Sequence, residues 1–296
     1  MTTNKISIVM AYYNRKEQLK STFDSIIKTR HTDWELIIVD DASDQEHKLG
    51  NLFTESEKKE FSIKIFEITK KEKSWTNPCI AYNLGIKKAT GDIIILQNPE
   101  CLHVGDILKF TNNNLQKREW LSFNCYGSPN FDFNREISLM SSPKEIYQKI
   151  YNLEFRQGGN GVVRDNVGGW LNHWDRHFVA YHYCAAIFKD DLFNYMDGGF
   201  NEDFRDAIGT DDDEFIKRLI YNRFSFTISE FTDSNPFVIH QFHDKPTHLR
   251  NVDYRTTRHI FNNACRKMRM KPENNIHIAP LRETPKGNRI ILEDDN

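Results

Sequence analysis

The sequence has no long apolar run, no excess of positive charge and no paired-cysteine motif. Lys and Arg number 40 against 42 Asp and Glu, a formal net charge of −2. The chain therefore lacks the basic surface that nucleic-acid binding requires. No hydrophobic stretch reaches membrane-spanning length, and the amino terminus lacks a basic segment followed by an apolar one. We expect a soluble, cytoplasmic protein with no membrane span and no nucleic-acid partner.

Cysteine is scarce, with five residues spread along 296. Their odd number and wide spacing argue against a disulfide framework, and no C-x-x-C pair indicates a zinc site. We expect most of them to be buried as small hydrophobic residues. The sequence also has no internal repeat and no low-complexity linker. Its 39% hydrophobic content, with 12% aromatic residues, is sufficient for a sizeable core.

The first hundred residues alternate buried strands with amphipathic helices. The apolar pattern predicts strands over residues 6–10, 34–39, 62–68 and 92–96. A capping asparagine followed by proline, Asn77-Pro78, predicts the start of the helix before the last of these strands. This order predicts an α/β fold with a mostly parallel sheet, right-handed crossovers and flanking helices.

Polar residues follow two of the predicted strands. Asp40 and Asp41 come after the second strand, and Asn98 and Glu100 come after the fourth. In open α/β sheets, ligands bind just beyond the carboxyl ends of the strands. The loop over residues 11–15 lies at the same end of the predicted sheet. The pattern therefore predicts one crevice for a nucleotide-type ligand or a metal ion.

Three stretches of this half resemble a known family. SIVMAYYNRKEQL, ELIIVDDAS and NPCIAYNLGIKKATGDIIIL are similar to the amino-terminal half of GT-A fold glycosyltransferases of the family 2 type. The YNR loop also resembles the FRNR loop of β-1,4-galactosyltransferases. The resemblance implies the GT-A (Rossmann-like) fold and a UDP-sugar donor whose uridine is held by the first loop and the acidic pair. The donor-binding residues that it implies are Ala11, Tyr13, Arg15, Asp40, Asp41, Asn83, Gln97 and Asn98.

The metal-binding motif of the family is altered in this sequence. The family's fourth strand ends in Asp-x-Asp, which binds a divalent metal, whereas this chain has Asn98-Pro99-Glu100. A glutamate and an asparagine carbonyl can still bind Mn²⁺ or Mg²⁺, but one negative charge is lost. The alternative is a simple turn after a strand. The family also has a histidine after its last core strand that completes the metal shell, and the resemblance implies His240, or alternatively His243, for this role.

The second half contains two further features. The segment over residues 156–177 is rich in glycine and contains Trp170 and Trp174. Tryptophan rings pack on sugar rings, so this segment is interpreted as an acceptor-binding region or lid, or alternatively as a small core. A four-residue acidic run then opens a predicted helix. There the backbone N–H groups stabilise carboxylates as anions.

The elements around this run, GGFNE and TDDDEFIKRL, resemble the GGF-(D/N)-E and (E/D)-D-x-(D/E)…R-L elements of the same families, including the galactosyltransferases. The resemblance implies Asp212 as the catalytic base, with Asp211 as the second choice. The alternative is that the acidic residues only cap and solvate the helix.

The sequence as a whole predicts one GT-A glycosyltransferase domain over residues 1–245. It divides into a nucleotide-sugar-binding half, 1–118, and an acceptor half, 119–245, and a helical extension and tail follow over 246–296. The implied reaction is an inverting, metal-dependent transfer of a hexosyl group from a UDP-sugar to a glycan or other hydroxyl acceptor. One alternative is a catalytically inactive member that binds a glycan or nucleotide. Another is a nucleotidyltransferase, although the first loop lacks the glycines and lysines typical of that class.

Overall fold

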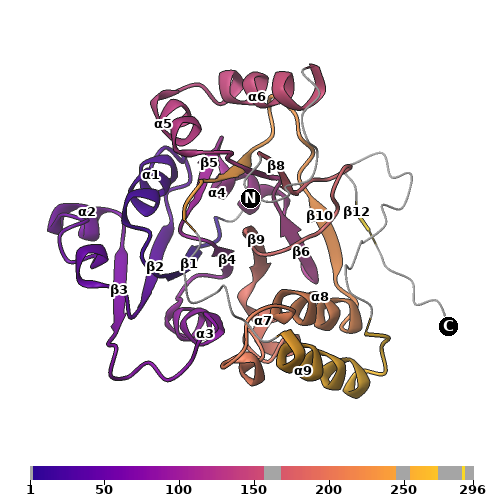
Figure 1. The fold of residues 1–296 in the computed structure, drawn as a ribbon. Coiled ribbons are helices and arrows are strands. Elements are labelled where there is room, and N and C mark those ends of the chain that lie inside the picture. The colour runs from indigo at the N-terminus through magenta and orange to yellow at the C-terminus, as the bar shows by residue number, and fades with distance from the viewer. Residues whose placement is uncertain (1–2, 157–167, 245–253, 273–288, 291–296) are drawn as a thin grey trace.

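The computed structural model describes residues 3–156, 168–244, 254–272 and 289–290. Its main sheet is made of β1 (Ile6–Tyr12), β2 (Trp34–Asp41), β3 (Ile63–Ile68), β4 (Ile93–Gln97), β6 (Glu119–Ser122), β9 (Cys184–Phe188), β10 (Ser225–Ile228) and β12 (Arg289–Ile290). These eight strands lie in the order β12-β10-β6-β9-β4-β1-β2-β3 (Figure 1). A smaller sheet has the order β5-β11-β7-β8, from β5 (Cys101–Val104), β11 (Phe237–His240), β7 (Cys125–Gly127) and β8 (Gly169–Asn172).

The helices surround both sheets. They are α1 (Lys16–Ile26), α2 (Glu55–Glu60), α3 (Cys79–Lys88), α4 (Ile107–Asn114), α5 (Phe131–Leu139), α6 (Pro143–Tyr151), α7 (Lys189–Tyr195), α8 (Asp211–Tyr221) and α9 (Tyr254–Lys267). None of the helices in the described ranges is both long enough and apolar enough to cross a bilayer. Figure 1 shows α8 and α9 side by side, and many of their residues are in contact.

The amino-terminal half has the predicted strand–helix alternation. The strands β3, β2, β1 and β4 are neighbours and all parallel. Every residue of β2 and β4 is buried, which explains why these strands read as continuous apolar runs. Helix α3 begins one residue later than predicted: Pro78 is its N-cap, and Asn77 Oδ1 accepts the backbone N–H of Cys79, the first helical residue. The α/β fold with a mostly parallel sheet and flanking helices is thus confirmed.

The strand β9 departs from the parallel arrangement. It lies between β4 and β6 and is antiparallel to both, so that Cys184 at its start is opposite Gln97 at the end of β4. An antiparallel strand begins where its parallel neighbours end. The residues just before β9 therefore lie at the same edge of the sheet as the loop that follows β4.

Two hydrophobic cores cover the two faces of the main sheet. Helices α1 and α4 pack on one face through residues such as Phe23 and Leu108. Helices α3, α7 and α8 pack on the other through residues such as Ile86, Leu192 and Leu219. Each such side chain, when fully buried, contributes about 1.5–3 kcal/mol. The five cysteines are buried and unpaired, as predicted.

The smaller sheet and α9 lie outside this sandwich. Helices α5 and α6 cover the smaller sheet, with Phe133 and Ile150 in a third core. Phe261 and Cys265 of α9 pack on Phe204. Strand β12 pairs with β10 and forms the edge of the main sheet. The division of the chain at residue 245 stays a prediction.

Candidate functional site at the carboxyl edge of the sheet

The loop after β1 is tied to the loop after β2. Asn14 donates from Nδ2 to Asp44 Oδ2 over 2.7 Å and accepts the backbone N–H of Asp44 over 2.9 Å. The backbone N–H of Asn14 donates to Ser43 Oγ. Asn14 has a φ of +51°, a left-handed conformation that asparagine adopts more readily than most residues. The asparagine of the YNR stretch therefore sets the shape of this loop.

Both carboxylates of the acidic pair are buried and partnered. Asp40 Oδ1 accepts a backbone N–H of the following loop over 2.8 Å, and its Oδ2 lies 3.1 Å from Lys48 Nζ. Asp41 Oδ2 lies 2.8 Å from Lys73 Nζ, and its Oδ1 accepts the indole N–H of Trp75 over 2.9 Å. A carboxylate has about four acceptor positions, so neither group is saturated by these bonds.

The other predicted donor residues of the first loop lie on both sides of this pair. Ala11 is opposite Val39 in the sheet, next to the acidic pair. The ring of Tyr13 is 5.0 Å from Lys73 Nζ, the same ammonium that binds Asp41. Arg15 Nη2 donates to the carbonyl oxygen of Asp244 over 3.3 Å. Arg15 thus joins the first loop to the end of the segment that carries His240 and His243.

Glu100 lies beside the two predicted histidines. Strand β11 is antiparallel to β5 with His240 opposite Cys101, and this places His240 next to Glu100. Glu100 Oε1 is 3.3 Å from His240 Nε2 and 3.4 Å from His243 Nε2. Burial alone would raise the pKa of Glu100. The hydrogen bonds from the two imidazoles outweigh it and hold this pKa well below its ordinary value.

This cluster fits a divalent metal ion. One ligand atom from each of Glu100, His240 and His243 lies within 4.8 Å of the others. Mixed nitrogen and oxygen ligands suit Mn²⁺ and the later transition metals better than Mg²⁺, which prefers oxygen alone. Three protein ligands would leave positions for phosphate oxygens. Asn98 is close by, but its Oδ1 already accepts the Tyr82 hydroxyl over 2.9 Å, so only a second lone pair is free for a metal.

Two predicted donor residues have their side chains bound inside the protein. Gln97 is fully buried; its Nε2 donates to the Cys101 carbonyl oxygen, and its Oε1 is 2.8 Å from His103 Nε2. Asn83 donates both amide hydrogens, to the Phe200 carbonyl oxygen and to Glu202. Its Oδ1 accepts the backbone N–H of Phe200. Asn83 thus holds the loop after α7, and the donor contact expected for it stays a prediction.

The four acidic residues that open α8 have different environments. Asp211 accepts the backbone N–H of Gly209, and Asp212 lies beside the His182 ring. Asp213 accepts the Tyr181 hydroxyl, and Glu214 pairs with the Arg218 guanidinium. Glu214 and Arg218 are both buried, and their ion pair of 2.9 Å is part of the scaffold. The Asp212 side chain is 39% exposed. Its Oδ1 is buried beside the His182 ring, and the exposed part of the side chain is accessible to a substrate.

Asp211, Asp212 and His182 form one electrostatic group. His182 Nδ1 is 2.8 Å from Asp212 Oδ1. Burial and the Asp212 carboxylate raise the pKa of Asp211 to about 7. Burial alone would lower the pKa of His182, but the Asp212 carboxylate outweighs it and raises this pKa above its ordinary value. Near neutral pH the group therefore holds protons that an exposed aspartate would have lost.

Asp211 and Asp212 lie on one side of the segment before β9. The cluster of Glu100, His240 and His243, called the metal-type cluster below, lies on the other side. The His182 ring is edge-on to the Tyr82 ring at 5.0 Å, and Tyr82 binds Asn98. The next residue, Tyr183, has its ring 5.8 Å from that of His240. Sequence analysis missed Tyr82 and His182. The apolar pattern over residues 182–189 reads as a buried strand, but only the antiparallel direction of β9 brings His182 and Tyr183 to this edge.

A short segment before α3 joins the acidic pair of β2 to the acidic helix. Trp75 donates its indole N–H to Asp41, and Asn77 Nδ2 donates to the Ala207 carbonyl oxygen in the loop before α8. Two residues span at most about 7 Å. The structure thus brings Asp41, Asp211 and, through His182 and Tyr82, the Glu100 cluster to one edge of the main sheet.

The tryptophans of the second half divide between core and surface. Trp170 is fully buried and packs against Tyr126 and Phe231, so for this residue the small-core alternative is correct. Trp174 is only partly buried, between two cores. Residues 157–167 of the same segment lie outside the described residues, so the lid interpretation stays a prediction.

Comparisons with known proteins agree with this architecture. Residues 7–119 match the model of glycosyl transferase family 2. A search of curated proteins found no match. Among solved structures, a mannosyltransferase from Pyrobaculum calidifontis in complex with GDP-Man and Mn²⁺ is similar at a TM-score of 0.55 and 14% identity, covering 92% of this chain and 66% of that one.

Two further structures extend the comparison. S. aureus TarS 1-349 in complex with UDP-GlcNAc has a TM-score of 0.58 at 13% identity, covering 86% of this chain and 65% of that one. GalNAc-T7 with UDP, GalNAc and Mn²⁺ has a TM-score of 0.56 at 13% identity, and the match covers 89% of this chain and 48% of that one. The chain thus spans less than two thirds of the length of these structures. The finer resemblance to β-1,4-galactosyltransferases stays a prediction. The part of the chain that the structure describes thus has the GT-A fold, and residues 7–119 are similar to glycosyl transferase family 2.

Proposed function

We propose that this protein transfers a hexosyl group from a UDP-sugar to a hydroxyl group of a glycan or other acceptor, with inversion and with a divalent metal, Mn²⁺ in preference to Mg²⁺. The observation that carries the proposal is the common position of Glu100, His240, His243 and Asp212 around the segment before β9. The transfer reaction needs a cation site for the leaving diphosphate and a base for the attacking hydroxyl, both within one site.

The donor would be held along the carboxyl edge of β1 and β2. Asp40 or Asp41 accepts the imide N–H of the uracil, and the half-buried ring of Tyr13 packs on the base. Arg15, on the same loop, faces the segment that carries the histidines. Glu100, His240 and His243 hold the metal, with Asn98 as an additional oxygen ligand. A divalent cation there offsets the charge that develops on the UDP leaving group.

Asp212 acts as the base that removes the proton from the acceptor hydroxyl. It is accessible from solvent, and the His182 ring fixes its orientation. Asp211 is the second candidate for this role, and burial together with the Asp212 carboxylate raises its pKa to about 7. A base must be within hydrogen-bond reach of the proton that it accepts. An acceptor hydroxyl would therefore bind between Asp212 and the leaving diphosphate.

The solved structures motivate the choice of donors for a test. TarS binds UDP-GlcNAc, GalNAc-T7 binds UDP, and the archaeal enzyme binds GDP-Man. Nucleotide release should be measured with UDP-glucose, UDP-galactose, their N-acetyl forms and GDP-mannose, with Mn²⁺, with Mg²⁺ and after chelation. We expect release from a UDP-sugar that requires Mn²⁺.

The decisive variant is Asp212→Asn, with the exposed Asp132→Asn on α5 as the matched control. We expect the first to lose at least about 100-fold in rate, the size of a general-base contribution, and the control to keep full activity. Donor binding without release in the wild type, with acceptor present, would instead support an inactive member of the fold. Pyrophosphate release from a nucleoside triphosphate would support a nucleotidyltransferase.

A further inference from the structure

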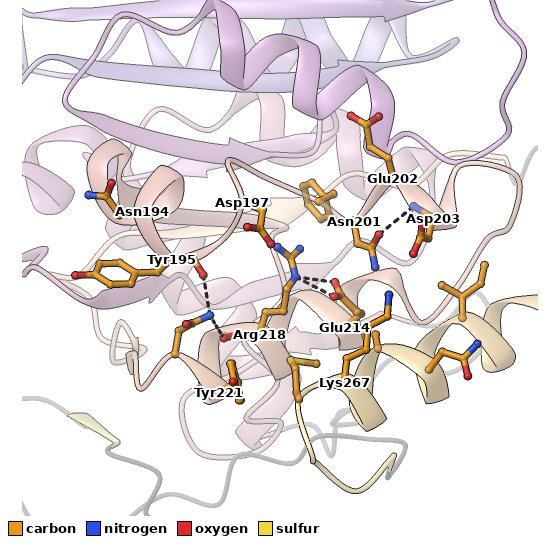
Figure 2. Close-up of a pocket in the computed structure, with 16 residues that line it drawn as sticks. Asn194, Tyr195, Asp197, Asn201, Glu202, Asp203, Glu214, Arg218, Tyr221 and Lys267 are labelled. Carbon is orange, nitrogen blue, oxygen red and sulfur yellow. Dashed lines mark hydrogen bonds and ion pairs between the residues drawn. The ribbon is translucent and has the colours of Figure 1, made fainter.

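A cavity of about 1090 Å³ lies outside the candidate transfer site. Its walls are the loop over residues 194–203, one face of α8 and one face of α9 (Figure 2). None of the metal-type cluster, the acidic pair of β2 or Asp212 is among the described residues that line it. Its volume is slightly above the range of about 300–1,000 Å³ that is typical of ligand pockets.

The frame of this cavity is rigid. Arg218 donates from Nη1 to the Met196 carbonyl oxygen over 2.7 Å and from Nη2 to the Gly199 carbonyl oxygen over 2.8 Å. It also binds Glu214 on its own helix. Asn222 donates from Nδ2 to the Tyr195 carbonyl oxygen over 2.7 Å. The loop is thus joined to α8 by two buried bonds from Arg218 and one exposed bond from Asn222, and Figure 2 shows the bond at Tyr195 and the Arg218–Glu214 pair. The cavity is therefore a formed feature of the fold.

Several polar groups on the walls are available to a ligand. Within the described part of the chain, the carboxylates of Asp197 and Asp203 and the ammonium of Lys267 form no hydrogen bond or ion pair. Among the described residues, Asn83 is the one hydrogen-bond donor to the Glu202 carboxylate. These groups present both acceptors and a donor. Hydroxyl groups, which donate and accept, match such a set.

Two tyrosine rings stand at the cavity with large exposed surfaces. Tyr195 is 42% exposed and Tyr221 is 55% exposed, and they come from the ends of α7 and α8. The guanidinium of Arg118 lies 3.8 Å from the centroid of the Tyr195 ring and fixes that ring. Apolar side chains of α9, Ile260 and Met268, add to the lining. Aromatic faces beside polar groups suit the C–H face of a sugar ring.

The net charge of the side chains that line the cavity indicates which class of ligand it can bind. Glu214 and Arg218 neutralise each other, which leaves Asp197, Glu202 and Asp203 against Lys267. This net negative lining disfavours phosphates, nucleotides and uronic acids. We propose that the cavity is a second, non-catalytic site that binds a neutral saccharide chain. This site would hold part of a glycan away from the transfer site, and its binding does not depend on the proposed transfer reaction.

The test is calorimetric titration with neutral tetrasaccharides of glucose, galactose, mannose or N-acetylglucosamine, and with tetragalacturonate as the anionic probe. We expect at least one neutral probe to bind with a Kd of about 1 mM or tighter. Tyr221→Ala should weaken this binding roughly tenfold, because the ring contributes its apolar face and no bond to the fold. Leu139→Ala on α5, another exposed apolar residue, should leave it unchanged.

The same titrations with Asp212→Asn separate this site from the transfer site. We expect Asp212→Asn, with or without UDP, to bind the neutral probe as the wild type does. The proposal is overturned if no neutral probe binds, if tetragalacturonate binds more tightly, or if Tyr221→Ala has no effect. It is also overturned if Asp212→Asn abolishes binding, because the saccharide would then occupy the transfer site. Loss of transfer with retained saccharide binding would contradict only the proposed transfer function.

Discussion

The pair of His182 and Asp212 gives the sharpest test of how the site works. His182→Leu removes the Nδ1 donor that lies 2.8 Å from Asp212 Oδ1 and keeps apolar bulk against Tyr82 and Phe200. A hydrogen bond to a charged group contributes about 1.5–3 kcal/mol, which corresponds to a rate factor of roughly 10 to 150. Because Asp212 is 39% exposed, water can replace the lost donor in part. We therefore expect a loss near tenfold in kcat and little change in the KM for the donor.

His182→Asn is the matched variant, because its Nδ2 can reach the position of the imidazole Nδ1 without carrying a titratable charge. We expect it to recover most of the rate. The pH profile should change as well. The Asp212 carboxylate raises the pKa of His182 above its ordinary value. Below that pKa the imidazolium holds the Asp212 carboxylate as an ion pair and weakens it as a base. Wild-type activity should thus rise with pH through this step, and His182→Asn should lack it.

The assay is steady-state UDP release at saturating Mn²⁺ across pH 5–9, with a double variant to locate the effect. His182→Leu combined with Asp212→Asn should be no slower than Asp212→Asn alone, because both changes act through one carboxylate. An unchanged rate and pH profile in His182→Leu would refute the positioning role. A loss in His182→Leu that exceeds the loss in Asp212→Asn would make the histidine itself the base.

Three further predictions follow from the same contacts. Glu100→Gln should weaken Mn²⁺ binding by at least about 10- to 100-fold, because changing only the outer partner of a metal ligand already costs this much. The electron paramagnetic resonance signal of free Mn²⁺ measures this affinity, and His259→Ala at an exposed position is the control. An unchanged affinity would place the metal elsewhere. Asp211→Asn should raise Tm more at pH 8 than at pH 4. The pKa of Asp211 is about 7 in the folded state and 3.8 in the unfolded state, so wild-type stability falls as the pH rises between these values. Equal Tm shifts at both pH values would contradict this. Gly199→Ala should destabilise the fold in chemical denaturation, because a Cβ there would lie 2.2 Å from Asn83 Oδ1 at a φ of +153°, whereas Gly50→Ala, with open space around it, should not.

The amino-terminal half of the fold could be predicted because its signals are local. Buried parallel strands such as β2 and β4 read as apolar runs, and the helices between successive strands indicate that the strands are parallel. The position of Asp40 and Glu100 at one edge follows from that direction alone. The three residues of the metal-type cluster were also predicted, although their approach depends on the pairing of β11 with β5.

The rest of the site depends on long-range packing that a single sequence does not encode locally. The segment over residues 182–189 reads as a strand in either direction, so the positions of His182 and Tyr183 beside the site became visible only with β9 antiparallel to β4. Asn83 and Gln97 carry amides that suit a donor, but the structure uses them inside the protein. For Trp170 the sequence pattern allowed a core or a binding surface, and contact with Phe231 decides for the core.

The altered motif at the end of β4 has a physical consequence for the proposed reaction. A two-carboxylate site cancels the charge of a divalent ion. Glu100 with neutral His240 and His243 would leave a net charge near +1 facing the diphosphate. A unit charge at about 4 Å contributes on the order of 4 kcal/mol at an effective dielectric constant of 20. Replacing the two carboxylates by one thus lowers the affinity of the site for the free metal. It also strengthens the attraction between the metal-loaded site and the negatively charged leaving group. The missing aspartates are therefore not, by themselves, an argument for an inactive protein, and the metal should bind more tightly with UDP than without it.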